Sequence, residues 1–298
     1  MKLTGLHLLL TYQCTFECDH CFVWGSPWQS GTMTLQAIQH ILHEGKALGT
    51  VNSIYFEGGE PFLYYVTLVK GVRMAAEMGY SVGMVTNGYW ATSVEDAHNW
   101  LEPFVGLIDD LSMSDDPYHW GSEGAENVGF AKTAASELGI SMGTIAVAQP
   151  ESTNAVEAVG QLPLGESTVM YRGRAAEALV DRAGKYDWEQ FTTCPYENLR
   201  DPGRVHIDPL GYLHLCQGIA LGNIFETSLR EIVAQFEPDA HPIAGPLLQD
   251  GPAGLVRRYQ VEHDANYADA CHLCFQTRKA LREQFPDVLT PDQMYAVP

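Results

Sequence analysis

Three cysteines close to the N-terminus are the residues whose types and spacing point most clearly to chemistry. Cys14, Cys18 and Cys21 lie in the pattern Cys-x3-Cys-x2-Cys. Three thiolates on one loop can hold three irons of a cubic 4Fe–4S cluster and leave the fourth iron open to a ligand. Zinc or buried thiols are the alternatives, but zinc normally has a fourth ligand, and His20 is too close in sequence to complete a tetrahedron easily. The spacing therefore favours an iron–sulfur cluster.

A second pattern is the turn Gly58-Gly59-Glu60-Pro61, which follows an apolar stretch at residues 53–56. Two glycines allow close approaches of the backbone that other residues exclude. The backbone carbonyls and the Glu60 carboxylate can accept hydrogen bonds from an ammonium group. The same residues also fit an ordinary loop, so the turn alone does not define a site.

Taken together, the two patterns resemble the radical SAM superfamily, in which the cysteine loop follows the first strand and the Gly-Gly-Glu-Pro turn ends the second. The resemblance implies an α/β fold, a partial (β/α)6 barrel over roughly residues 1–150. It also implies a 4Fe–4S cluster whose open iron is chelated by the methionine amino and carboxyl groups of S-adenosylmethionine (SAM). In this family one electron from the cluster cleaves SAM, and the resulting 5′-deoxyadenosyl radical abstracts hydrogen from the substrate.

The resemblance also implies which residues contact SAM. His20 takes the position, usually aromatic, that lies against the adenine; the alternative is an exposed loop imidazole. The Gly-Gly-Glu-Pro turn receives the amino group, and polar residues at the next two strand ends contact the ribose and carboxylate. The complete expected set is His20, Phe22, Gly58, Gly59, Glu60, Pro61, Asn87, Ser112 and Ser114.

Recognition of the SAM carboxylate departs from the usual pattern. Many relatives carry an arginine shortly after a histidine in this region, whereas His119 is followed by Trp-Gly-Ser-Glu-Gly-Ala-Glu. Arg172 or Arg174, at the start of a predicted helix, could supply the contact instead. A surface role at the start of that helix fits these two arginines equally well.

Four further cysteines form a second candidate metal site: Cys194, Cys216, Cys271 and Cys274. Four thiolates suit a fully ligated 4Fe–4S cluster or a structural zinc ion. The stretch from Val205 to Cys216, and the later Cys-x2-Cys pair, resemble the SPASM extension of radical SAM enzymes or its shorter form, Twitch. No cysteine follows Cys274, so the resemblance implies one auxiliary cluster, as in Twitch.

The cysteine count bears on the reaction. Three ligands and four ligands use all seven cysteines. No thiol then remains to donate hydrogen to a substrate radical, a role for which epimerising members of the family often use a free cysteine. An oxidative outcome is favoured, because an auxiliary cluster can accept the electron left on a product radical.

The elements that must position these residues alternate between strands and helices in the first half of the chain. Apolar stretches at 6–10, 53–56, 81–85, 107–113 and 140–147 predict strands, and the segments 34–49, 66–78, 93 onward and 125–138 predict helices. Such alternation predicts a parallel sheet with ligands at the carboxyl ends of its strands. The cysteine loop and the glycine-rich turn both fall at such ends.

The second half follows a different pattern. Residues 148–170 form a connection without clear periodicity, so we expect a barrel domain over 1–170 and a SPASM/Twitch-like domain over 171–298. The latter contains a hairpin at 204–216 and a helix near 229–236. Residues 238–254, rich in Pro and Gly, predict a loop, and a final helix is expected from about 275 to 285.

Other polar and aromatic residues follow the predicted strand ends. Glu57, Asp115 and Asp116 could orient substrate or move protons. The aromatic residues there could line an apolar pocket or simply pack in loops. They are Trp24, Trp28, Tyr89, Trp90, Tyr118, His119 and Trp120.

Composition limits the possible partners. Lys and Arg total 17 against 37 Asp and Glu, a net charge of −20. This charge disfavours nucleic acid and anionic membranes as partners. No targeting signal or membrane span is visible, so we expect a cytoplasmic protein in which cysteines bind metal rather than form disulfides.

The sequence thus predicts a radical SAM oxidoreductase or peptide-modifying enzyme. The family analogy points to cross-linking or desaturation of a ribosomally made peptide, with flavodoxin or ferredoxin as reductant. Dehydrogenation of a small alcohol or sugar is the alternative, since no separate leader-binding domain fits before Cys14. A nonenzymatic Fe–S electron carrier or a zinc-stabilised binding protein also remains open.

Overall fold

A single nine-stranded sheet forms the centre of the computed structural model, which describes residues 1–121, 126–152 and 165–297. Its strand order is β10-β9-β8-β1-β2-β3-β4-β5-β6. Strands β1 to β6 run parallel, in chain order, as a partial barrel requires. The strands of this sheet are β1 (Gly5–Leu9), β2 (Ser53–Glu57), β3 (Ser81–Thr86), β4 (Asp110–Ser114), β5 (Met142–Val147), β6 (Gly165–Ser167), β8 (Arg204–Ile207), β9 (Tyr212–Cys216) and β10 (Ile219–Asn223).

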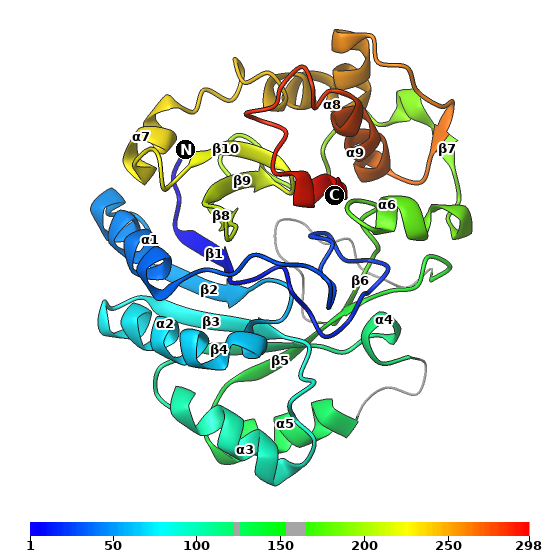
Figure 1. Cartoon of the computed structure of the whole chain (residues 1–298). Helices are drawn as coiled ribbons and strands as arrows, with labels where there is room; N and C mark the ends of the chain where they lie inside the picture. The colour runs from blue at the N-terminus through cyan, green and yellow to red at the C-terminus, as the bar shows by residue number, and fades with distance from the viewer. Residues whose placement is uncertain (122–125, 153–164, 298) are drawn as a thin grey trace.

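Helices cover the outer side of the curved sheet and the C-terminal region (Figure 1). A separate two-stranded ribbon pairs β7 (Tyr186–Asp187) with β11 (Asn266–Tyr267). The helices are α1 (Leu35–Leu48), α2 (Tyr65–Glu77), α3 (Val94–Leu101), α4 (Pro117–Trp120), α5 (Glu126–Glu137), α6 (Ala175–Ala178), α7 (Leu229–Gln235), α8 (Ala244–Tyr259) and α9 (Ala270–Ala280).

The predicted helix boundaries in the first half are set by capping residues. The Thr34 side chain accepts a hydrogen bond from the Ala37 backbone N–H, and Gly49 ends α1 with a positive φ of 83°. Ser93 caps α3 in the same way through Asp96. These caps satisfy backbone groups that a helix end leaves unpaired, so they fix where each helix starts or stops.

The alternation of side chains along the strands separates the core from the lumen of the barrel. In β2, Ile54 and Phe56 are fully buried and belong to the main hydrophobic core. Tyr55 and Glu57, on the opposite face, line a cavity instead. Strands thus present apolar residues to the helices and polar residues to the lumen, because successive side chains point to opposite faces.

The hairpin predicted at 204–216 is confirmed, and it extends the barrel sheet. Strand β8 pairs in parallel with β1, placing Val205 opposite Leu6 and His206 opposite His7. Strands β9 and β10 then continue antiparallel. The expected boundary near residue 170 therefore lies between two segments that share one sheet.

Two predictions for the C-terminal half were wrong. The stretch 238–254 is not a loop throughout, because α8 occupies Ala244–Tyr259 with a kink at Asp250 and Gly251. Its Gly and Pro residues bend the helix rather than prevent it. The final helix α9 starts at Ala270, earlier than expected, because the Asp269 side chain caps it by accepting from His272 N–H.

Smaller differences concern strand starts and the connection. Strand β4 starts at Asp110 rather than at 107, and β5 at Met142 rather than at 140. The connection 148–170 contains β6, but residues 153–164 lie outside the described part of the chain, as does residue 125 of the predicted helix. Every helix in the described ranges is too short or too polar to cross a membrane.

Candidate functional site

A cavity of about 240 Å³ lies in the lumen, reaching the carboxyl ends of the parallel strands. Most of the residues expected to contact the cluster and SAM line it. From that set the cavity wall contains Cys14, Cys18, His20, Cys21, Phe22, Gly58, Gly59, Asn87, Ser112 and Ser114. Glu60 and Pro61 do not line it. Residues from strands β1 to β4 are thus brought together as the sequence predicts.

The cysteine loop follows β1 and is held by hydrogen bonds to its own backbone and thiols. The Cys14 N–H donates to Ser26 O (3.0 Å), and Gly25 N–H donates to the Cys21 Sγ (3.2 Å). The Asn87 side chain approaches the Cys14 Sγ at 3.5 Å. Burial raises the pKa of Cys14 to about 12. All three cysteines line the cavity, and the sulfurs of Cys14 and Cys21 accept N–H donors, as the sulfurs of an iron–sulfur cluster do.

Arg174 and Gly173 clamp this loop from the other half of the chain. The buried Arg174 guanidinium donates to Cys18 O (2.7 Å) and Gly25 O (2.8 Å). Gly173 has a φ of +59°, and a Cβ there would lie 2.6 Å from Cys21 O. Arg174 therefore holds the loop, whereas Arg172 and Arg204 line the cavity.

The Gly58-Gly59 turn lies directly against the backbone that leads into the cysteine loop. Gly59 N–H donates to Thr11 O (2.7 Å), and Glu60 N–H donates to Gln13 O (2.8 Å). A Cβ on Gly59 would lie 2.1 Å from Gln13 O. The two glycines are thus needed for close backbone contact as well as for the cavity wall.

Glu60 is fully buried behind that wall. Its carboxylate accepts from Thr86 Oγ1 (2.8 Å), Asn87 N–H (2.7 Å) and Phe62 N–H (3.0 Å). Burial raises its pKa to about 7, although the three donors favour the ionised form. In this arrangement Glu60 joins the turn to the end of β3, so its carboxylate is already engaged within the protein.

His20 is a half-buried residue of the cavity wall whose Nδ1 is shielded from solvent. Its Nδ1 has no hydrogen-bond partner among the described residues, and the same holds for Thr168 Oγ1, also in the cavity wall. Burial lowers the pKa of His20 to about 4. The ring lies 4.7 Å from Tyr118 and 5.1 Å from His119. A neutral ring and unpaired polar atoms fit a bound nucleoside.

Arg172 lies between this cavity and a second, smaller one. Its Nη1 is 3.3 Å from Cys216 Sγ and 3.2 Å from Glu197 Oε1, and its guanidinium lies 5.6 Å from the Phe22 ring. The second cavity is lined by Cys194, Cys216, Cys271 and Cys274. Arg172 thus contacts Cys216 of the second cysteine set and lies close to Phe22, the residue after Cys21 of the first set.

The four cysteines of the second cavity come from distant parts of the chain and line it together with Arg172 and the buried Arg278. Arg278 is fully buried close to Cys274, and its Nε has no partner in the described ranges. Guanidinium groups next to four thiolates offset the negative charge of the thiolates, whether these bind an iron–sulfur cluster or a zinc ion. The donor set therefore fits a four-cysteine metal centre.

Several residues of the large cavity's wall were not predicted from the sequence, among them His7, Tyr55, Arg204 and His206. Polar residues inside buried strands, as in Leu-His-Leu-Leu and Val-His-Ile, were the available signal. Of the acidic candidates, Glu57 and Asp116 line the cavity. His119 does as well, whereas Trp28 is 85% exposed. Most of the other aromatic candidates pack away from the cavity.

The fold and the cysteine loop define the class of protein. Residues 8–111 match the model of the radical SAM superfamily. This stretch contains the three N-terminal cysteines, the turn at 58–61 and strands β2 and β3. Residues 8–111 therefore form a radical SAM domain, and the cofactors of this superfamily are a 4Fe–4S cluster and SAM.

Among known proteins, the chain is similar to a "putative peptide biosynthesis protein YydG" of Bacillus subtilis. The two are 25% identical over 228 residues, which cover 74% of this chain and 70% of that protein. The chain is also 31% identical over 83 residues to an S-adenosylmethionine-dependent nucleotide dehydratase of Selenomonas ruminantium. That match covers 28% of this chain and 29% of the dehydratase.

Two solved structures resemble the fold. The structure of BtrN in complex with AdoMet and 2-DOIA has a TM-score of 0.54 at 14% identity and covers 87% of this chain and 90% of its own. The structure of anSMEcpe with bound AdoMet and a peptide has a TM-score of 0.51 at 14% identity, covering 95% and 97%. These likenesses confirm the partial barrel.

Proposed function

We propose that this chain uses SAM to abstract hydrogen from a ribosomally made peptide and so introduces a cross-link or a desaturation. The main support for this proposal is that the cysteine loop, the Gly58-Gly59 turn and polar side chains of the lumen all line one cavity. The similarity to a peptide biosynthesis protein over 74% of the chain supports a peptide as substrate.

In this proposal the N-terminal half of the cavity holds the first cluster and SAM. Cys14, Cys18 and Cys21 bind three irons. The backbone at Gly58 and Gly59 receives the amino group of SAM. The remaining contacts expected for SAM come from His20, Phe22, Asn87, Ser112 and Ser114.

The residues around the cofactors bind and orient SAM and the substrate, and they exclude water from the cavity. When bound, the first cluster supplies the electron that cleaves SAM to the 5′-deoxyadenosyl radical, and the second cluster supplies an electron acceptor. Of the two arginines expected to receive the SAM carboxylate, Arg172 lines the cavity, whereas Arg174 is occupied by loop carbonyls. Phe22 lines the same cavity, with its ring 5.6 Å from the His206 ring.

Residues 171–298 act in this proposal as a Twitch-like domain with one auxiliary 4Fe–4S cluster on Cys194, Cys216, Cys271 and Cys274. All seven cysteines line one of the two cavities. A spare thiol to donate hydrogen is therefore lacking, which supports oxidation over epimerisation. Flavodoxin or ferredoxin is the proposed reductant.

Mass spectrometry of a candidate precursor peptide after anaerobic turnover tests the reaction. A mass loss of two hydrogens supports the proposal. An unchanged mass with uptake of deuterium from solvent contradicts it and points to epimerisation. If peptides are unchanged while a small alcohol or sugar loses two hydrogens, the substrate class is wrong but the oxidation stands.

Alanine variants separate the two metal sites. Cys18→Ala should abolish turnover, whereas Cys271→Ala should remove only the spectroscopic signal of the second cluster. The intact protein should bind about eight irons. Loss of both signals in Cys271→Ala would contradict two independent sites.

A further inference from the structure

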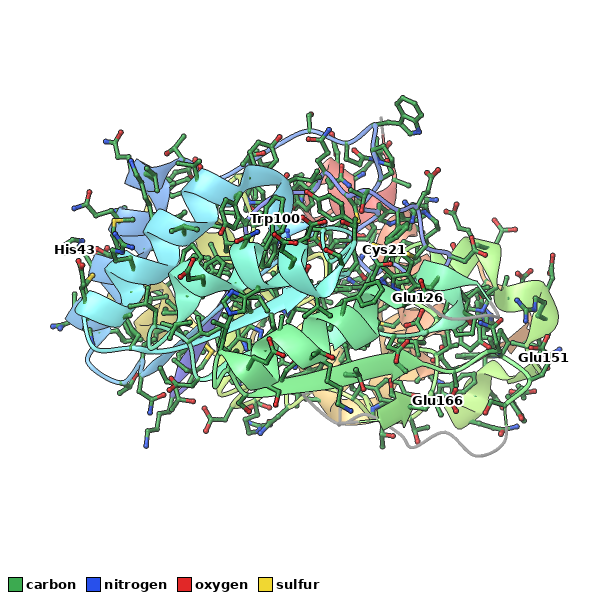
Figure 2. The ribbon with its side chains drawn as sticks, turned by 90° about the horizontal axis from the view of Figure 1, so that it is seen from below. Cys21, His43, Trp100, Glu126, Glu151 and Glu166 are labelled. Atoms are coloured by element: carbon green, nitrogen blue, oxygen red, sulfur yellow. The ribbon has the colours of Figure 1, made fainter. Side chains whose placement is uncertain are left out.

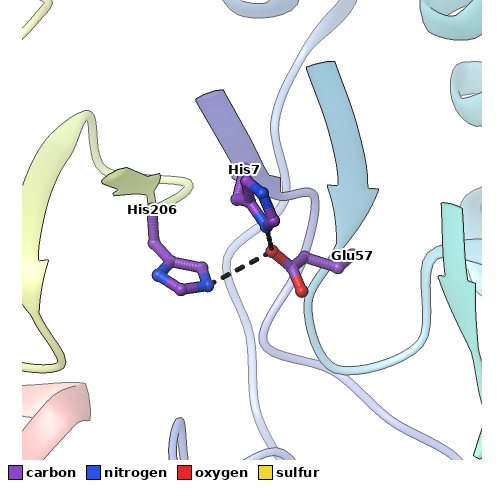
Figure 3. Close-up of side chains that lie close together, drawn as sticks. All are labelled: His7, Glu57 and His206. Atoms are coloured by element: carbon purple, nitrogen blue, oxygen red, sulfur yellow. Dashed lines mark hydrogen bonds and ion pairs between the residues drawn. The ribbon is translucent and has the colours of Figure 1, made fainter. Parts of the chain in front are cut away.

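Three side chains from adjacent strands meet on the lumen wall, apart from the residues assigned to SAM (Figure 3). His7 lies on β1, Glu57 ends β2, and His206 lies on β8. The Glu57 Oε1 is 2.6 Å from His7 Nδ1 and 3.2 Å from His206 Nε2. All three residues line the large cavity.

The sheet holds His7, Glu57 and His206 in fixed positions. His206 stands opposite His7 in the β1–β8 ladder, and Glu57 stands opposite Leu9 in the β1–β2 ladder. The His7 ring stacks on Tyr55 with centroids 4.8 Å apart, and the Phe22 ring lies 5.6 Å from the His206 ring. Sites built on strands keep their geometry better than sites on loops.

We propose that His7, Glu57 and His206 form a binding site for a divalent first-row transition-metal ion. Two imidazoles and one carboxylate are the ligand set of several catalytic zinc and non-haem iron sites. Their ligand atoms lie within 4.8 Å of one another. A tetrahedral ion with bonds of about 2.0–2.2 Å separates its ligand atoms by about 3.4 Å, so small side-chain rotations suffice.

An ion with three protein ligands keeps at least one coordination position for another group. Because the three residues line the cavity, that position would face its interior. The ion would bind an oxygen of a carbonyl or carboxylate group on the substrate and so orient it. The site is made only when β8 joins the edge of the barrel at β1, which explains why two segments 199 residues apart supply its histidines.

Zinc titration of the anaerobically reconstituted holoenzyme tests the proposal. Both clusters occupy the thiolates, and constant cluster absorbance shows that zinc does not displace iron. Calorimetry should show about one zinc ion bound per chain. X-ray absorption at the zinc edge should show nitrogen and oxygen ligands near 2.0–2.2 Å and no sulfur near 2.3 Å.

Three separate variants, His7→Gln, Glu57→Gln and His206→Gln, should each weaken zinc binding at least tenfold while retaining the iron content. His43→Gln is the matched control, because His43 is exposed on α1 at the edge of the molecule, far from Cys21 (Figure 2). It should bind zinc as the wild type does.

Absence of zinc binding, sulfur in the zinc coordination shell, or unchanged affinity in the three variants would overturn the proposal. His7 and His206 would then be hydrogen-bond partners of Glu57 alone. The titration contains neither SAM nor peptide, so its failure is distinct from failure of the proposed function.

Discussion

At Gly59 the backbone of the turn after β2 touches the backbone leading into the cysteine loop. The same position faces the cavity, so one residue couples the shape of the SAM site to that of the cluster site. Arg172 couples sites in a similar way, since it lines both cavities. Single residues therefore link features that the chain supplies from distant segments.

Gly59→Ala should destabilise the protein by about 1–3 kcal/mol, because a Cβ 2.1 Å from the Gln13 carbonyl oxygen forces the backbone apart. The free energy of unfolding in denaturant measures this loss. Gly129→Ala is the control: Gly129 lies in α5 with open space around it, and alanine there should stabilise the helix by up to about 1 kcal/mol. Equal effects of the two substitutions would refute the close-contact argument.

Arg172→Gln should lower the midpoint potential of the second cluster by on the order of tens of millivolts. The guanidinium lies 3.3 Å from Cys216 Sγ, and its positive charge favours the more negative, reduced state of a cluster. Redox titration followed by electron paramagnetic resonance measures the potential. Arg182→Gln, at an exposed ion pair with Glu151, should leave it unchanged.

Among the elements, α8 shows how a kinked helix can position a metal ligand. The bend at Gly251 brings α8 against residues 191–193, which lead to Cys194, and Ala253 N–H donates to Phe191 O (3.0 Å). The Gly- and Pro-rich sequence of this region predicted a loop because composition does not distinguish a kink from a break. Tertiary packing of its buried leucines decided the outcome.

Gly251→Ala should reduce incorporation of the second cluster while leaving the first intact. Gly251 has a φ of +56°, and a Cβ would lie 2.3 Å from the backbone of Thr192. Alanine must therefore displace the segment before Cys194. Iron analysis should fall toward about four irons per chain; a full complement of iron in this variant would show that the segment tolerates the shift.

For the whole molecule, the β/α alternation made the partial barrel predictable, because local periodicity and capping residues such as Thr34 agree with the fold. The cysteine loop and the glycine-rich turn were predictable because each is a short motif. The grouping of His7, Glu57 and His206 was not predictable, since His7 and His206 come together only through the pairing of β8 with β1. Nonlocal strand pairing of this kind leaves no contiguous motif in the sequence.

We propose that Cys14, Cys18 and Cys21 hold the cluster that cleaves SAM. Chromatographic quantification of 5′-deoxyadenosine, after anaerobic reduction of the reconstituted protein with SAM, tests it most directly. We expect 5′-deoxyadenosine from the wild type and none from Cys18→Ala. Zinc in place of iron at the N-terminal site, or a fully loaded wild type that releases no 5′-deoxyadenosine, would contradict it.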